Sequence, residues 1–164
     1  MIKGNELEKL AGRANLNYRQ QVRALILKIP VPIILTSRGL VAQESTVDFA
    51  GIVEGGYFLA FDAKETQNKT SFPLKNIKQH QVTYLNYVQK LGGYAFFMIH
   101  FKKVHKDKVY ITPMYLINNY IEKNDRQSIP ISEFKDEWLA DPADYLNKVL
   151  ELDFRRSNKT TTDS

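Results

Sequence analysis

Two aspartates and a lysine have the residue types and the spacing that best suit a chemical reaction in this sequence. Asp48 lies in the segment Val47–Val53, and Asp62 and Lys64 close the segment Tyr57–Lys64. Alternate residues of a strand share a face, so Asp62 and Lys64 are expected to point the same way. If the two segments pair, both carboxylates come within reach of one hard cation such as Mg²⁺. A cation held there, with a lysine beside it, suits phosphodiester hydrolysis.

The same residues also have a plainer interpretation. An Asp-x-Lys pattern in a strand is more often part of a solvated face than of a site, and Asp48 could equally form a turn. The other face of the second segment carries the apolar residues Tyr57, Leu59, Phe61 and Ala63. A charged pair on an otherwise buried hairpin favours the functional interpretation.

Periodicity and turn residues indicate the elements that must position these side chains. The segments Val47–Val53 and Tyr57–Lys64, joined by Glu54-Gly55-Gly56, predict a hairpin. Two amphipathic helices are expected, one from the N-cap Asn5 to about residue 26 and one over 74–91, closed by Gly92-Gly93. Further strands are expected at Ile33–Leu35, Tyr94–Phe101, Val109–Thr112 and Ile129–Ile131, and further helices at Met114–Ile121 and at Pro142–Leu152 after the cap Asp141.

Composition narrows the class of protein. At 164 residues, with 43% hydrophobic and 12% aromatic residues, the chain predicts one domain over residues 1–154 and a disordered tail over 155–164. No apolar run is long enough for a membrane span, and no apolar N-terminal segment indicates a secretory signal. The lack of cysteine excludes disulfides, cysteine-ligated zinc and a thiol nucleophile, and favours the cytoplasm.

Charge is distributed unevenly along the chain. Residues 39–63 carry a net charge of −4, whereas residues 1–38 carry +5 and residues 64–108 carry +7. An acidic segment between two basic ones is typical of a cation site within a phosphate-binding surface, although solvated lysine-rich faces give the same pattern. The side chains expected to contact DNA phosphates are Lys69, Lys75, Lys78, Arg13 and Arg38.

Three strings of residues carry a resemblance to a known family. Asp48-Phe49-Ala50-Gly51, Phe61-Asp62-Ala63-Lys64-Glu65-Thr66 and Asn68-Lys69-Thr70-Ser71-Phe72-Pro73-Leu74 resemble the RecU family of Holliday junction resolvases, and the likeness continues through His80-Gln81. The resemblance implies an α/β, restriction-endonuclease-like (PD-(D/E)xK) fold, with a central mixed β-sheet flanked by α-helices. It also implies a homodimer that uses Mg²⁺ or Mn²⁺ to make paired symmetric nicks in four-way junctions during DNA recombination and repair, with recombination proteins as possible partners.

The resemblance implies a role for individual residues. It makes Asp48 and Asp62 metal ligands and Lys64 the catalytic lysine, although the family usually has Glu where this chain has Asp62. Glu8 is expected to complete the metal site from the first helix, and Gln81 to hold the attacking water or a phosphate. Glu8 could instead serve the helix as part of a capping box, and Gln81 as a polar cap.

One departure from the family concerns the stalk that enters the junction centre. Only Leu35–Val47 is available for it here, so any stalk is expected to be short. Two alternatives therefore stay open: a nuclease of the same fold that acts on other branched or duplex DNA, and a catalytically weak DNA-binding accessory protein of recombination.

Overall fold

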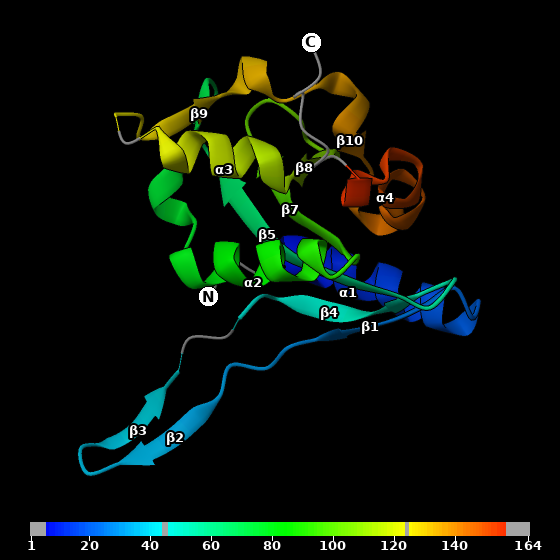
Figure 1. Cartoon of the computed structure of the whole chain (residues 1–164), viewed down its shortest axis with the longest axis vertical. Helices are drawn as coiled ribbons and strands as arrows, with labels where there is room; N and C mark the ends of the chain where they lie inside the picture. Colours follow the sequence, from blue (N-terminus) through cyan, green and yellow to red (C-terminus); the bar gives the residue numbers. More distant parts are fainter. Residues whose placement is uncertain (1–5, 44–45, 124, 157–164) are drawn as a thin grey trace.

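A mixed six-stranded sheet, in the order β1-β4-β5-β7-β8-β10, divides the chain into two layers (Figure 1). The computed structural model describes residues 6–43, 46–123 and 125–156. The strands of the sheet are β1 (Ala24–Lys28), β4 (Phe49–Val53), β5 (Tyr57–Thr66), β7 (Tyr94–Phe101), β8 (Val109–Pro113) and β10 (Leu139–Ala140). Only β5 and β7 pair in parallel, and the other neighbours are antiparallel. The expected mixed sheet flanked by helices is confirmed.

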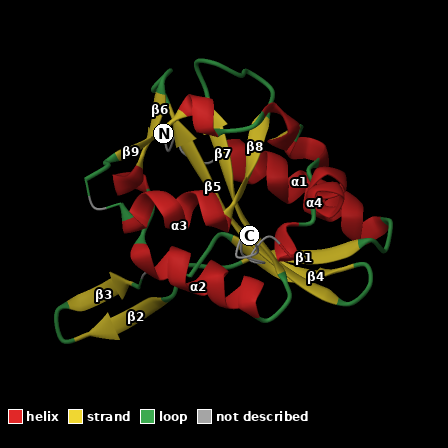
Figure 2. Ribbon diagram, turned by 45° about the horizontal axis from the view of Figure 1, so that its top comes forward, coloured by secondary structure: helices red, strands yellow, loops and turns green. Residues whose placement is uncertain are grey.

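Helices cover both faces of this sheet (Figure 2). Side chains of α1 (Glu6–Gln20) and α4 (Leu146–Leu152) join one apolar core, which includes Phe61 of β5. Side chains of α2 (Gln79–Lys90) and α3 (Met114–Glu122) join a second core on the opposite face, which includes Ala60. Because consecutive residues of β5 enter different cores, the middle of this strand is buried on both faces.

The predicted hairpin around the two aspartates is confirmed. β4 and β5 are antiparallel, and their last pair before the site is Phe49 with Phe61. Gly55 and Gly56 of the turn have φ angles of 89° and 83°, which glycine adopts without the steric cost of a side chain. The register places Asp48 and Asp62 at the next position along the ladder, at the end of β4.

The prediction that the first helix runs to about residue 26 is wrong. α1 ends at Gln20, and its expected cap Asn5 lies outside the described residues. Val22 adopts a left-handed backbone with φ 55°, after which β1 pairs with β4. Buried Ala24 and Ile26 alternate with exposed Leu25 and Leu27, which is the period of a strand. The apolar residues of this segment fit the period of a helix as well as that of a strand, and pairing with β4 makes the segment a strand.

Several other boundaries differ from the sequence prediction. The second helix begins at Gln79 rather than at residue 74, because a 3₁₀ turn, η1 (Leu74–Asn76), precedes it. The loop before it contains β6 (Ser71–Pro73), which pairs with β9 (Ser128–Pro130). At the C-terminal end, Asp141 caps the 3₁₀ turn η4 (Pro142–Asp144), and α4 follows it separately. Two further 3₁₀ turns, η2 (Ile131–Glu133) and η3 (Asp136–Trp138), connect β9 to β10.

A two-stranded arm projects from the body between β1 and β4 (Figure 1). It consists of β2 (Ile33–Thr36) and β3 (Gly39–Ala42), with Arg38 in the connecting turn. The expected range Leu35–Val47 is therefore wrong at its start, because the first strand begins two residues earlier. The arm is short, as expected, with strands of four residues each.

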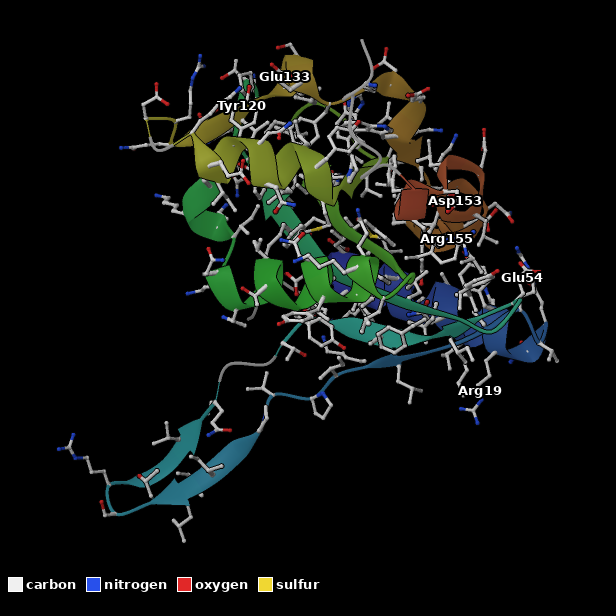
Figure 3. The ribbon with its side chains drawn as sticks, in the orientation of Figure 1. Arg19, Glu54, Tyr120, Glu133, Asp153 and Arg155 are labelled. Atoms are coloured by element: carbon white, nitrogen blue, oxygen red, sulfur yellow. The ribbon has the colours of Figure 1, made fainter. Side chains whose placement is uncertain are left out.

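The side chain of Arg155 fixes the end of the described chain to the sheet. Arg155 lies within η5 (Phe154–Arg156), pairs with Asp153 at 2.6 Å, and lies over the rings of Tyr57 and Tyr94 at 4.2 and 4.4 Å (Figure 3). The expected disordered tail from residue 155 therefore includes an anchored Arg155, and residues 157–164 lie outside the described part. Among the described residues, no helix has the length and hydropathy required to cross a bilayer.

Candidate active site

Asp48 and Asp62 hold each other through the backbone. The N–H of Asp48 donates to Oδ1 of Asp62 at 3.0 Å, and the N–H of Ala63 donates to Oδ2 of Asp48 at 2.9 Å. The two carboxylates therefore take the place of the next backbone rung of the β4–β5 ladder. These backbone N–H groups fix the orientation of both carboxylates relative to the sheet.

Asp62 and Lys64 form an ion pair on one face of β5, as the strand period predicts. Nζ of Lys64 lies 2.8 Å from Oδ2 of Asp62. Asp62 is only 1% exposed, because the second core reaches it through Ala60 and neighbouring side chains of β7. Asp62 is thus a buried group within β5, one position beyond the last pair with β4, rather than a residue of a solvated face.

Burial and a neighbouring negative charge raise the pKa of Asp48. Burial, followed by the negative charge of Asp62, raises the pKa of Asp48 from 3.8 to about 6, against the lowering effects of the Ala63 hydrogen bond and of Lys28. Like charges that share a site disfavour a second ionisation, and an added cation removes that penalty. The protein therefore keeps two carboxylates together at a cost that a bound cation would offset.

Glu8 does not join the two aspartates in a group of three acids. Among the described residues, no three or more His, Cys, Asp or Glu side chains are grouped so that they could hold a metal ion. Glu8 instead forms an ion pair with Lys28, the last residue of β1. Lys28 also lies 5.5 Å from the ring centre of Phe49 and lowers the pKa of Asp48. It thus connects Glu8 to the aspartates electrostatically.

Lys28 is the residue near this site that sequence reasoning missed. Lys28 belongs to the segment Ala24–Lys28, the start of which was predicted from its helical period to lie in the first helix. Lys28 was therefore not expected beside Asp48. The register of β1 with β4, in which Lys28 faces Phe49, brings it there. Four consecutive apolar residues precede Lys28, so the sequence shows no polar–apolar alternation there, and only the pairing of β1 with β4 places Lys28 near the site.

The side chains of the candidate residue Gln81 and of Thr66, the last residue of β5, bond to the local backbone. The side-chain oxygen of Gln81, which is 8% exposed, accepts from the N–H of Lys78 at 3.3 Å and caps α2. Oγ1 of Thr66 accepts from the N–H of Asn68 at 3.2 Å. The bond of Gln81 agrees with its alternative role as a cap of the helix. A role of Gln81 in the reaction stays a prediction.

The expected DNA contacts lie on three parts of the molecule, and all five side chains are exposed. Lys69, Lys75 and Lys78 lie in the segment between β5, which carries Lys64, and α2. Arg13 lies on α1, which covers the other face of the sheet, and Arg38 lies at the tip of the arm. The three lysines thus follow the strand of the site in the chain, whereas the two arginines lie on separate elements.

The donor set of the site suits a hard divalent cation. Carboxylate oxygens are the ligands that Mg²⁺ prefers, and it usually takes only one or two of them beside water and phosphate oxygens. Asp48 and Asp62 supply two carboxylates whose mutual repulsion a cation would relieve. The residues present therefore fit Mg²⁺ or Mn²⁺.

Comparisons with known proteins give a consistent result. The family model described as "RecU: Recombination protein U" matches residues 2–152. The chain is 34% identical to the Holliday junction resolvase RecU of Shouchella clausii, over 98% of this chain and 85% of that protein. Proteins of the same name are 32% identical in Lactococcus lactis subsp. lactis, over 92% and 76%, and 36% identical in Ligilactobacillus salivarius, over 81% and 68%.

Proposed function

The chain belongs to the RecU family of recombination proteins, and from this premise we propose that it is a metal-dependent endonuclease that resolves four-way DNA junctions. The observation that carries the proposal is the group of Asp48, Asp62 and Lys64 at the end of the β4–β5 ladder. Two carboxylates with a neighbouring ammonium match the chemistry of phosphodiester hydrolysis.

Asp48 and Asp62 are the residues that would hold Mg²⁺ or Mn²⁺. When bound, the cation supplies charge neutralisation at the phosphate and lowers the pKa of water in the site. The protein contributes position: the N–H groups of Ala63 and Asp48 keep both carboxylates oriented before substrate arrives. This orientation reduces the reorganisation that the reaction would otherwise require.

Lys64 supplies the second positive charge of the site. Its ammonium, held by Asp62, lies where it can donate to a non-bridging phosphate oxygen or to the attacking water. Attack of the water oxygen on phosphorus breaks one P–O bond, which leaves a phosphate on one DNA end and a hydroxyl on the other. Gln81 is proposed to orient the water or a phosphate once DNA releases its side chain from the helix cap.

A four-way junction as substrate suggests a dimeric assembly and a location in the cytoplasm. A junction has two equivalent strands to cut, which suits a homodimer with two sites related by a twofold axis. Lys69, Lys75 and Lys78 are proposed as phosphate contacts near the site, with Arg13 and Arg38 as more distant ones. Action on bacterial DNA would place the protein in the cytoplasm, where recombination proteins are possible partners.

Cleavage of a mobile four-way junction, compared with a linear duplex of the same sequence with and without Mg²⁺, tests the proposal. We expect paired nicks in the junction only when Mg²⁺ is present, and little cutting of the duplex. Equal cutting of both DNAs would favour a nuclease of the same fold with a broader substrate. Junction binding without any cutting, over a range of Mg²⁺ and Mn²⁺, would favour the accessory role.

A further inference from the structure

Strand β1 forms an open edge of the sheet. It stands first in the order β1-β4-β5-β7-β8-β10, and no strand in the described part of the chain pairs with its outer side. The N–H of Ile29, directly after β1, donates to the carbonyl oxygen of Asp48. Such bonds recur at every second residue of an antiparallel pair, so the N–H and C=O groups of Lys28 and Ile26 point away from β4. The outer side of β1 thus presents backbone donors and acceptors to a further strand.

A groove of about 370 Å³ follows this edge beside α1. On the side of β1 it is lined by the consecutive residues Ile26, Leu27 and Lys28. Consecutive side chains of a strand point to opposite faces, so a groove that touches all three reaches around the outer edge of β1. On the side of α1 the lining runs from Glu8 to Arg19, a rise of roughly 16 Å along the helix. About five extended residues span the same length, so the groove fits a short peptide strand.

A buried amide in the lining of this groove is only half satisfied. Asn15 lines the groove and is 5% exposed, and its Oδ1 accepts from the hydroxyl of Tyr145 in the core. Its Nδ2 has no hydrogen-bond partner among the described residues. Because the two polar atoms of an amide diverge, Nδ2 points away from Tyr145. A buried donor without a partner is unfavourable, and a carbonyl oxygen supplied by a ligand would remove that cost.

Gly12 keeps the groove open in the middle of α1. A side-chain carbon built at Gly12 would meet no atom within 4 Å, so packing within the fold does not require a glycine there. Its φ is not positive, so the backbone does not require one either. A glycine inside a helix costs stability relative to alanine. Gly12 lines the groove, and the close approach of another backbone is the use that this glycine serves.

Charge around the groove favours an acidic occupant. The cations Lys9, Arg19 and Lys28 line it against one acid, Glu8, and three positive charges against one negative charge leave a net charge of +2. Glu8 and Lys28 pair with each other, so Lys9 and Arg19 carry the excess. Both are exposed, and Figure 3 shows Arg19 projecting away from the body. Carboxylates near the ends of a bound segment would meet these two cations.

The walls between these cations are apolar and suit a peptide better than DNA. Leu16, Ile26 and Leu27 line the groove, and Leu16 and Leu27 are 61% and 56% exposed. The aromatic residue of the lining, Phe49, is 1% exposed, so it offers no ring face on which a base could stack. Phosphates also require cations along the whole contact rather than at its ends.

We propose that the groove is a docking site for an extended, acidic segment of another protein, which adds to the outer edge of β1 as a further strand. Backbone groups of β1 pair with the segment, and Asn15 donates to one of its carbonyl oxygens. Alternate apolar side chains of the segment lie against Leu16 and Leu27, and its acids meet Lys9 and Arg19. Docking here does not require nuclease activity.

Binding of a synthetic peptide to the full chain tests this site. The probe is a short, fluorescently labelled peptide of alternating valine and aspartate, followed by anisotropy. Gly12→Leu fills the groove and raises the helix propensity of α1, so it should fold and weaken binding at least about 10-fold. Asn17→Leu, at an exposed position of α1 outside the groove, is the matched control and should bind as wild type does. No binding by wild type, or equal binding by both variants, would overturn the proposal.

The charges and the backbone of the site have separate measurements. Arg19→Glu should weaken binding of the valine–aspartate peptide about 5-fold and strengthen that of a valine–lysine peptide. Methylation of alternate amide nitrogens of the peptide should abolish binding, because a strand ladder needs those donors. Bound peptide should slow hydrogen exchange at the N–H groups of Ile26 and Lys28, whereas those of Leu25 and Leu27, which point toward β4, should change little. Unchanged exchange at Ile26 and Lys28 would contradict pairing with the edge.

The same variants identify other occupants. If Gly12→Leu lowers junction affinity and leaves peptide binding unchanged, the groove belongs to DNA. If Gly12→Leu instead lowers the sedimenting mass of the chain, the groove belongs to a second copy. Either result would overturn the proposal. Peptide binding by a wild-type chain that cuts no junction would contradict the proposed function alone.

Discussion

The backbone N–H of Asp48 donates to the carboxylate of Asp62, while the carboxylate of Asp48 accepts from the residue that follows Asp62. Two hydrogen bonds in opposite directions therefore join the strands here as in an antiparallel ladder, with the side chains of the two acids in place of carbonyl groups. Both are fixed by the same backbone that forms the sheet.

Asp62→Asn should remove cleavage and preserve the fold. The amide oxygen can still accept from the N–H of Asp48, but the cation loses a charged ligand and Lys64 loses its ion pair. We expect a fall in the junction cleavage rate of roughly 100-fold or more, with junction affinity nearly unchanged. The exposed Asp107→Asn variant is the control and should cut normally. Normal cutting by Asp62→Asn would contradict its role as a ligand.

The contribution of Asp48 to the stability of the metal-free protein should fall as pH rises from about 4 to about 6. The pKa of Asp48 is about 6 in the folded chain, against an ordinary 3.8, so the folded state binds more protons in this window. Above pH 6 the full penalty, on the order of 3 kcal/mol at most, is present. The free energy of unfolding of wild type minus that of Asp48→Asn, measured in urea with EDTA, isolates this effect. A difference that does not change with pH would rule it out.

Lys64→Met should affect stability as well as activity. The carboxylate of Asp62 is buried, and removal of its partner leaves the charge uncompensated, which we expect to cost about 3 kcal/mol of unfolding free energy. The double variant with Asp62→Asn should recover most of this loss, because no charge remains to be compensated, yet it should not cut DNA. If the two losses simply add, the ion pair does not contribute to folding.

Lys75→Gln should weaken junction binding without changing where the junction is cut. A lysine that contacts one phosphate contributes about one unit to the slope of log affinity against log salt concentration. We expect that slope to fall by about one, and affinity to fall similarly for junctions of different sequence. Lys148→Gln, on α4 over the opposite sheet face, should leave both quantities unchanged. A loss confined to one junction sequence would indicate base contact instead.

The sequence was informative where local patterns and final pairing agree. The two glycines predicted the β4–β5 turn, and the strand period placed Asp62 beside Lys64. Ala24–Lys28 was misassigned in part to a helix because its apolar residues fit both periods, and only its pairing with β4 resolves them. The place of Lys28 and the separation of Glu8 from the aspartates depend on that long-range pairing. So does the joining of β6 to β9, which are more than fifty residues apart in the chain.

The arm has a mechanical link to the site. Where the chain leaves β1 for the arm, the N–H of Ile29 donates to the carbonyl oxygen of Asp48 at 2.8 Å. The arm that carries Arg38 is thus joined at its root to the backbone of Asp48, the proposed metal ligand. If DNA binds the tip of the arm, a displacement of the arm would act on the backbone of Asp48 through this hydrogen bond, and so on the position of the proposed metal ligand.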